Sequence, residues 1–166
     1  DLHLGGVYGR QLPRASTHVC ERFFLEETYT AEPARRSLPN DRQATLRGIF
    51  FSNVNAACRK ELVLWYPFDE TLVMSEDQQW AKAVLEGGYT VAYEPRAEVY
   101  HSHRYTCRQV FQRYFDSGAS LGHIVKGGLG TPLSQHLEYI VRECRRAIHE
   151  ESVAHVPFVL TYEACR

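Results

Sequence analysis

The acidic pair Glu76-Asp77 is the part of this sequence whose position most strongly suggests chemistry. Ser75 precedes the pair and Gln78 follows it, which is the pattern of a capping box at the start of a helix. Carboxylates in the first turn of a helix are stabilised by the macrodipole and by free N–H groups, which is a purely structural role. The same environment holds a carboxylate in place and ionised, so that it can accept a proton from an alcohol as a general base. These residues alone leave both roles open.

Two histidines, His101 and His103, flank a single serine on a segment that is expected to be extended. Residues i and i+2 of an extended chain point to the same side, so the two imidazoles could share a metal ion. A zinc site would need a third ligand, which the neighbouring residues do not supply. The alternative is a pair of partly exposed histidines at the end of a strand.

Asparagine and arginine side chains supply further candidates for binding. Asn53 and Asn55 lie in a polar corner after an apolar stretch, where asparagine is common because it tolerates turn conformations. Their amides could instead hydrogen-bond the hydroxyls of a sugar. Arg10 and Arg113 could stabilise the negative charge that develops on a phosphate leaving group, although an arginine on a helix is more often a solvated charge.

The elements that must position these residues are a mixture of helices and short extended segments. The helix after Ser75 is expected to run to about Glu86 with one apolar stripe, and Gly87-Gly88 is expected to end it. Extended segments are expected at residues 4–9, 49–51, 89–93 and 97–101, with a turn at 94–96. Further helices are expected at residues 19–29, 56–64, from 106 or 107 to 116, and 132–149.

Glycine and proline mark the expected breaks. Residues 30–47 hold two prolines and are expected to form a loop, Gly118 to break the helix before it, and residues 127–130 (GGLG) to form a flexible joint. The helix at 132–149 is amphipathic, and we expect it to close the core of its own domain or to dock on a neighbour. Its charged residues are expected to face mostly outward: Arg142, Glu143, Arg145 and Arg146. Residues 153–160 are apolar but too few to assign to a helix or a strand.

The composition is that of a globular chain with a core. The chain has 166 residues, of which 44% are hydrophobic and 23% charged. The net charge of -1 argues against a nucleic-acid binder that depends on a strong overall positive field. The five cysteines are odd in number and far apart, which is typical of reduced cysteines rather than a disulfide scaffold. No apolar run approaches the roughly 18 residues of a membrane span, and the first residues show no secretory signal.

Five stretches occur in a fixed order along the chain: VYGRQLPR (7–14), FFSNVNAACRK (50–60), PFDE (67–70), SEDQQWAKAVLEGGYTVAYEPRAEVYHSH (75–103) and FQRYFDSG (111–118). In this order and spacing they resemble the family 2 glycosyltransferases, and more narrowly the bacterial rhamnosyltransferase-like branch, which implies polysaccharide biosynthesis. The resemblance covers about residues 5–120. Each stretch is a weak signal by itself, and the resemblance depends on all five.

The resemblance implies an α/β fold, namely the C-terminal half of a GT-A fold with a mixed sheet flanked by helices. Residues 1–120 would form the acceptor-side, catalytic half of that domain, and residues 121–166 a C-terminal helical extension. The first nucleotide-binding strands of the family and its DxD motif have no counterpart here. The chain is therefore expected to be a portion of a longer enzyme, with little or no activity by itself.

The resemblance also implies roles for single residues. Asp77 matches the aspartate that acts as the base in an inverting transfer, and His101, ahead of His103, matches a histidine that completes the metal and diphosphate site. Mg²⁺ or Mn²⁺ is the expected cofactor, with its main ligands outside this chain. Residues expected to contact acceptor or donor are Glu76, Asn53, Asn55, Arg10 and Arg113. Tyr114 replaces the tryptophan of the family's processive Gln-x-x-Arg-Trp motif, which favours transfer of single sugars.

The expected partners are a nucleoside-diphosphate-sugar donor and a saccharide or lipid-linked acceptor, and not nucleic acid. The expected location is the cytoplasm or the inner face of the membrane, and peripheral membrane contact and self-association stay open. Two other functional classes stay open as well. One is a non-catalytic carbohydrate-binding or interaction module, and the other is a zinc hydrolase that uses His101 and His103.

Overall fold

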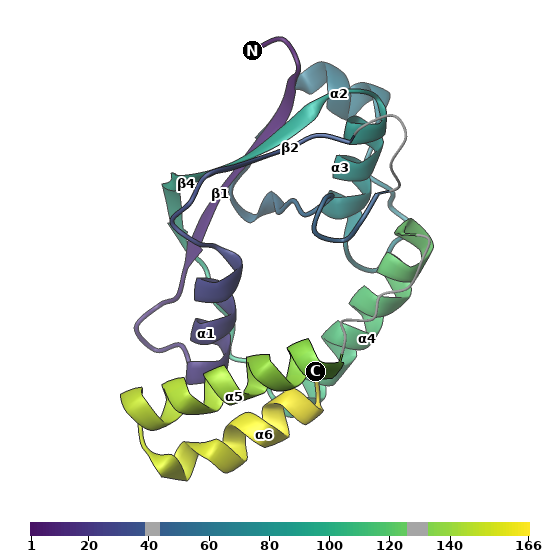
Figure 1. Ribbon diagram of the computed structural model, residues 1–166. Coiled ribbons are helices and arrows are strands. Elements are labelled where there is room, and N and C mark those ends of the chain that lie inside the picture. Colours follow the sequence, from purple (N-terminus) through teal and green to yellow (C-terminus); the bar gives the residue numbers. More distant parts are fainter. Residues whose placement is uncertain (39–43, 126–132) are drawn as a thin grey trace. The chain divides into compact units, whose positions relative to one another are not determined.

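The computed structural model describes residues 1–38, 44–125 and 133–166 (Figure 1). Tertiary contacts divide the chain into two units, which are interleaved in sequence and are described separately. Their bounds are Asp1–Gln11, Tyr29–Val99 and Asp116–Leu129 for unit 1, and Leu12–Thr28, Tyr100–Phe115 and Gly130–Arg166 for unit 2. None of the helices in the described ranges is both long and apolar enough to cross a membrane.

A four-stranded mixed sheet organises unit 1. In sheet order the strands are β2 (Ala34–Arg36), β4 (Thr90–Tyr100), β1 (Leu4–Leu12) and β3 (Ala56–Cys58). β2 pairs antiparallel with β4, and β3 pairs antiparallel with β1 in a register that places Gly6 opposite Cys58. This arrangement confirms the predicted α/β class with a mixed sheet, and it is consistent with part of a GT-A-like fold.

Helices α2 (Lys60–Trp65) and α3 (Glu76–Glu86) flank the sheet. A Cβ atom on Gly6 would lie 2.9 Å from the Trp80 ring, so a glycine in β1 leaves room for this fully buried indole. The bounds of α3 and its buried stripe are as predicted: Trp80, Ala81, Val84 and Leu85. Gly88 takes φ 84°, the left-handed conformation expected where the helix ends.

Strand β4 shows that the predicted turn at residues 94–96 is wrong. The strand is continuous from Thr90 to Tyr100 and contains Pro95. β2 pairs only with residues 91–93 of β4, so Pro95 lies beyond the end of its neighbour on that side. Proline has no N–H to donate, but no residue of β2 lies opposite Pro95 to accept a hydrogen bond. Strands tolerate proline under this condition.

Three further predictions in unit 1 are wrong in part. The expected loop at 30–47 contains β2, because residues 34–36 pair antiparallel with β4; its residues 39–43 lie outside the described part. Residues 49–51 are not a strand, although Ile49 and Phe51 are fully buried. The helix expected from residue 56 begins only at Lys60, because β3 occupies the preceding positions in its pairing with β1.

Unit 2 is helical. It contains α1 (Val19–Thr28), the first part of α4 (Cys107–Ile124), α5 (Leu133–Glu150) and α6 (Val156–Ala164), preceded by a short 3₁₀ turn at Val153–His155. Helices α1, α4, α5 and α6 meet in one apolar cluster: Val19, Cys20, Val110, Ala147, Val159 and Tyr162. The predicted helix at 19–29 is thereby confirmed, and the unassigned segment 153–160 is mostly helix.

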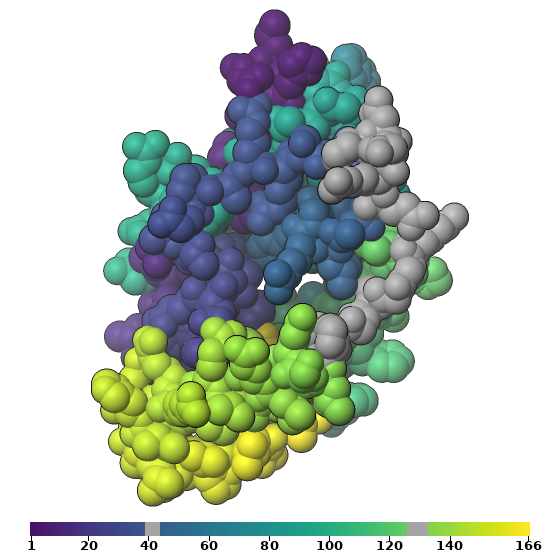
Figure 2. Space-filling view, in the orientation of Figure 1, coloured from purple at the N-terminus to yellow at the C-terminus, as the bar shows by residue number. Residues whose placement is uncertain are grey.

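Helix α5 packs with a different face from the one predicted. Large apolar side chains on it are exposed: Leu133 (72%), Leu137 (53%), Val141 (48%) and Ile148 (47%). Glu143 and Ala147 are instead fully buried. On this side of α5, Ala147 joins the apolar cluster of unit 2, and Arg142 and Arg146 form ion pairs with two consecutive glutamates of α1. The side chains of α5 and α6 form the green and yellow face of unit 2 in Figure 2.

Helix α4 continues through Gly118, where the sequence predicted a break. A glycine inside a helix costs about 1 kcal/mol relative to alanine, which tertiary contacts can offset. Next to it, the Ser120 hydroxyl accepts a hydrogen bond of 3.4 Å from the backbone N–H of Met74. The predicted joint at 127–130 and the Thr131-Pro132 helix start lie outside the described residues, and the division at residue 120 stays a prediction.

Candidate active site

Asp77 lies in the first turn of α3, and backbone N–H groups hold both of its carboxylate oxygens. Gln78 donates to Oδ1 at 2.8 Å, and Asn53 donates to Oδ2 at 3.2 Å. The second bond joins the helix start to the 3₁₀ turn Asn53–Asn55, which is the predicted polar corner. Each carboxylate oxygen has a further lone pair. The group is therefore fixed in position and can still accept a proton.

Ser75 departs from the predicted capping box. It occupies the N-cap position but makes no side-chain cap hydrogen bond, and its backbone is left-handed with φ 66° and ψ 24°. Among the described residues it is the only one other than glycine with positive φ. This conformation costs about 1–2 kcal/mol, and strain of this kind clusters at functional sites. The N–H of Gln78, which the Ser75 side chain would bind in a capping box, donates to Asp77 Oδ1 instead.

Burial raises the pKa of Asp77 above its ordinary value. The hydrogen bond from Asn53 opposes the shift because it favours the charged form, and the nearby charge of Glu76 adds to the shift. Glu76 itself is half-buried in the same helical turn. A carboxylate whose pKa is raised is a stronger base, which suits proton removal near neutral pH.

A buried polar network that includes Gln11 and Tyr29 lies next to the corner. Gln11 adjoins the candidate Arg10 in the sequence, and neither Gln11 nor Tyr29 is among the predicted site residues. Gln11 Nε2 donates to the Tyr29 hydroxyl at 2.6 Å and to Ser52 Oγ at 2.9 Å. Gln11 and Tyr29 are each 5% exposed, and Ser52 is 8% exposed. The available signal was a lone glutamine near the end of an apolar strand, which needs partners once it is buried.

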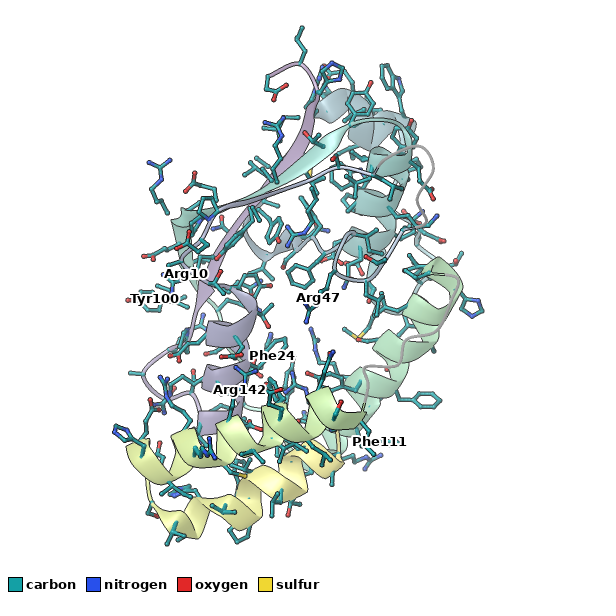
Figure 3. The ribbon with its side chains drawn as sticks, viewed as in Figure 1. Arg10, Phe24, Arg47, Tyr100, Phe111 and Arg142 are labelled. Carbon is teal, nitrogen blue, oxygen red and sulfur yellow. The ribbon has the colours of Figure 1, made fainter. Side chains whose placement is uncertain are left out.

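Arg10 and Asn55, both predicted to bind ligand, are tied to the protein itself. Asn55 Nδ2 donates to the Ala97 carbonyl at 2.8 Å, and Gly9 permits this because a Cβ there would lie 2.4 Å from that nitrogen. On β1, Arg10 Nε donates to the Tyr29 carbonyl at 3.1 Å, and Nη1 lies 3.4 Å from a Glu98 oxygen (Figure 3). These bonds leave further polar atoms on both side chains, and the roles of Arg10 and Asn55 in binding stay predictions.

His101 and His103 belong to unit 2, and their Nε2 atoms lie 2.9 Å apart. Burial lowers the pKa of both imidazoles, and nearby positive charge adds to the effect, so the neutral form that ligates metals is favoured. His103 stacks on Tyr105, and the Arg113 guanidinium lies 5.5 Å from that ring. Within the described ranges, no group of three or more His, Cys, Asp or Glu side chains could hold a metal. The zinc hydrolase alternative therefore lacks its third ligand there.

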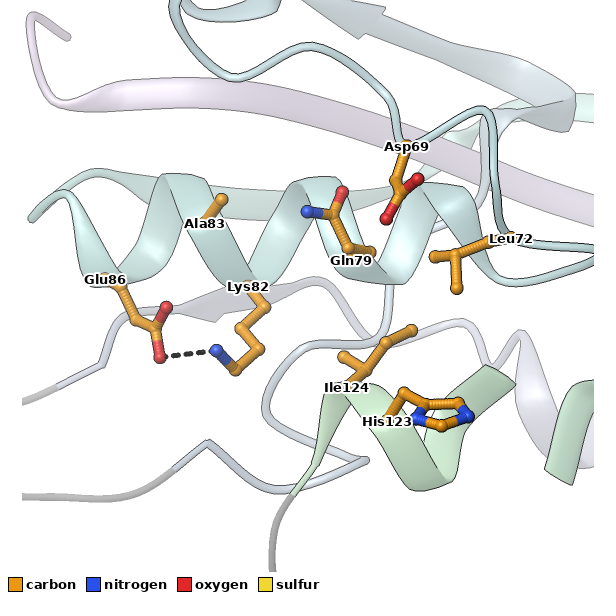
Figure 4. Close-up of a pocket in the computed structure, with 8 residues that line it drawn as sticks. All are labelled: Asp69, Leu72, Gln79, Lys82, Ala83, Glu86, His123 and Ile124. Atoms are coloured by element: carbon orange, nitrogen blue, oxygen red, sulfur yellow. Dashed lines mark ion pairs between the residues drawn. The ribbon is translucent and has the colours of Figure 1, made fainter. Parts of the chain in front are cut away.

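One hollow of about 240 Å³ lies on a different side of α3 (Figure 4). Its lining residues are Asp69, Leu72, Gln79, Lys82, Ala83, Glu86, His123 and Ile124. The pair Lys82 and Glu86 spans 2.7 Å between Nζ and Oε1, which neutralises charge along this surface. Asp77 does not line it, so the hollow is separate from the carboxylate that could remove a proton.

The α/β architecture and the fixed carboxylate fit a glycosyltransferase, and curated relatives support that class. Over 119 residues the chain is 34% identical to "O-antigen chain rhamnosyltransferase WbaN" of Salmonella anatum. It is equally similar to "O-antigen chain rhamnosyltransferase RfbN" of Salmonella typhimurium. Each alignment covers 71% of this chain, and the similarity supports a rhamnosyltransferase-like family.

The chain spans about 38% of the length of these relatives. No family model matches it. No solved structure matches it either. The assignments to the GT-A fold and to family 2 stay predictions.

Proposed function

We propose that the protein containing this chain transfers a sugar, rhamnose in the first instance, from a nucleoside-diphosphate donor to a hydroxyl of a saccharide or lipid-linked acceptor. The observation that supports this best is Asp77, held at a helix start by two backbone N–H groups. The similarity to two rhamnosyltransferases supports this class of reaction and this sugar. Family 2, a GT-A fold and inversion at the anomeric carbon are parts of the same proposal.

Asp77 would act as the general base. Its free lone pair accepts the proton of the acceptor hydroxyl while the hydroxyl oxygen attacks the anomeric carbon and the diphosphate leaves from the opposite face. The proton ends on the carboxylate, where burial already favours the protonated form. The Asn53 and Gln78 N–H groups keep the carboxylate in one orientation during the transfer. Asn53, Asn55 and Glu76 would bind acceptor hydroxyls from the corner and the helix start.

His101 would contribute one imidazole ligand to a divalent cation, for which its neutral form is suited. When bound, Mg²⁺ or Mn²⁺ would neutralise charge on the leaving diphosphate. The main ligands of either ion are proposed to lie outside this chain. Arg10 of unit 1 and Arg113 of unit 2 are each proposed to contact the donor, as the family resemblance implies.

The test is Asp77→Asn in the full-length protein, assayed with a nucleoside-diphosphate rhamnose and a saccharide acceptor. Turnover should fall by about 10²–10⁴-fold, the usual loss for a missing base, while donor binding stays nearly unchanged. Glu70→Gln is the control, because Glu70 is an exposed carboxylate outside the site. Near-normal turnover of Asp77→Asn would rule out the base. Saccharide binding without any transfer by the full-length protein would favour the carbohydrate-binding alternative instead.

A further inference from the structure

Gln11 uses both hydrogens of its amide nitrogen inside unit 1. Nε2 donates to the Tyr29 hydroxyl and to Ser52 Oγ, at 2.6 and 2.9 Å. An amide nitrogen has two hydrogens, so these two bonds use its full donor capacity. The side chain is 5% exposed, which means that water does not compete for either bond. Gln11 therefore holds the Ser52 side chain in one place.

Ser52 directly precedes the residue whose N–H holds Asp77. Ser52 has an extended backbone, φ -141° and ψ 124°, and the peptide plane that follows it carries the Asn53 N–H. That N–H reaches Asp77 Oδ2 at 3.2 Å. Because the peptide is planar, fixing Ser52 limits the directions in which the Asn53 N–H can point. Gln11, Ser52 and Asn53 thus form a continuous path to the carboxylate.

The corner is held differently on its two sides. After it, Asn55 bonds the Ala97 carbonyl and β3 pairs with β1. Residues 49–51 form no strand, so no sheet hydrogen bonds fix the chain just before Ser52. Burial of Ile49 and Phe51 anchors the segment, but apolar contacts do not orient a peptide plane as a hydrogen bond does. Directional contacts at Ser52 come from the Gln11 amide, at 2.9 Å from Ser52 Oγ, and from the Tyr29 hydroxyl, which Gln11 also bonds.

We propose that Gln11 is a positioning residue for the transfer reaction: through Ser52 it aims the Asn53 N–H at Asp77 and so holds the base in its working orientation. The proposal rests on the proposed function, in which Asp77 removes the acceptor proton. Gln11 does not contact the reacting atoms in this scheme. No role in binding the donor is assigned to it.

A pH signature follows from the charges around Asp77. Glu76 beside it and Tyr29 behind the corner are the titratable groups that face it, and Tyr29 stays neutral because burial raises its pKa to about 12. The Asn53 N–H favours the ionised carboxylate. If Gln11 no longer fixes the corner, this bond weakens and the pKa of Asp77 rises further. The acidic limb of the kcat profile should then move to higher pH.

The experiment measures kcat, KM for the donor and the kcat–pH profile of the full-length enzyme for Gln11→Leu and Ser52→Ala. We expect kcat to fall about tenfold, the size of one hydrogen bond to a charged group, with KM for the donor unchanged and the acidic limb moved to higher pH. The double variant should lose no more than the larger single loss, because both changes break one path. Tyr93→Phe is the matched control. It removes a buried hydrogen bond of 2.7 Å to Thr30 in the same unit, outside the path.

A second readout does not need activity. The Asp77 carboxyl can be titrated by carbon NMR in the 166-residue chain, where Gln11→Leu and Ser52→Ala should raise its pKa and Tyr93→Phe should not. An unchanged pKa in both folded variants would overturn the positioning role, whatever the enzyme does. If Gln11→Leu and Ser52→Ala raise the pKa of Asp77 while Asp77→Asn keeps full turnover, the proposed function fails, but the path from Gln11 through Ser52 and Asn53 to Asp77 is supported. Ser52→Ala changes packing so little that it decides the matter even if Gln11→Leu fails to fold.

Discussion

Replacing Glu143 with glutamine is expected to remove a pH dependence of stability from unit 2. Glu143 is fully buried on α5, near the Glu163 carboxyl and the Cys20 thiol. Burial, and then the negative charge of Glu163, raise its pKa from 4.5 to about 8. The folded protein therefore keeps a proton that the unfolded chain releases as the pH rises above 4.5.

The size of the effect follows from proton linkage. A carboxyl whose pKa is raised in the folded state gives its full stabilisation below the unfolded pKa and loses it as the pH rises toward the folded pKa. Between the unfolded-state and the folded-state pKa of Glu143, each unit of rising pH lowers the free energy of unfolding by about 1.4 kcal/mol. From about pH 5 to about pH 7.5 the loss is about 3 kcal/mol. Glu143→Gln keeps the shape of the side chain and cannot ionise, so it should escape this loss.

The assay is urea unfolding of the wild-type chain and of Glu143→Gln, followed by circular dichroism at several pH values between about 5 and 7.5. Relative to wild type, the variant should gain up to about 3 kcal/mol across this range. Glu138→Gln is the control, because Glu138 is exposed on the same helix and should leave the wild-type slope unchanged. Equal slopes for wild type and Glu143→Gln would refute the reasoning, since they would show that the buried carboxyl ionises in the folded state as it does in the unfolded chain.

Three further predictions concern backbone and packing. Gly9→Ala would place a Cβ 2.1 Å from the Ala97 carbonyl oxygen, so it should destabilise unit 1 by about 2 kcal/mol or more in thermal unfolding. A Cβ at Gly118 would meet open space, so Gly118→Ala should stabilise helix α4 by about 0.5–1 kcal/mol. Ser75→Gly should raise the unfolding midpoint, because glycine adopts the left-handed conformation without strain; a lower midpoint would show that the serine side chain contributes more than the strain costs. Leu137→Gln should change the unfolding free energy by less than about 0.5 kcal/mol, and a large loss would show that this exposed face of α5 is covered in solution.

The sequence predicted best where the determinants of structure are local. The bounds of α3 followed from the expected capping box at Ser75 and from Gly87-Gly88, both of which act within one turn of the helix; the start is right, although Ser75 makes no side-chain cap hydrogen bond. Long-range contacts explain the failures. Pro95 suggested a turn, but β2 ends before it, and the strand continues. Local composition contains no information on where a partner strand stops.

Helix α5 shows a different limit. Its periodicity correctly predicted an amphipathic helix, because the spacing of apolar residues is a property of the segment itself. The same pattern was wrong in part about which face is buried: Cys144 packs against the apolar cluster as predicted, but Glu143 is buried and Leu137 is exposed. That choice depends on the acidic residues of α1 that pair with Arg142 and Arg146, and on the buried position of Glu143 near Glu163. A pattern that divides a helix into two faces does not identify the neighbour that each face meets.

The candidate site combines both situations. The pair Glu76-Asp77 could be singled out because carboxylates at a helix start are visible in the sequence, and Asn53 because asparagines in a corner are visible too; the choice of Asp77 within the pair came from the family resemblance. The contact between them uses the backbone N–H of Asn53, which every residue except proline carries, so no choice of side chain could reveal it. The sequence contains this contact only indirectly, because Gln11 and Ser52 must be polar to orient the Asn53 N–H toward Asp77. Residues that act through the backbone of a neighbour are therefore identified only when the folded path between them is known.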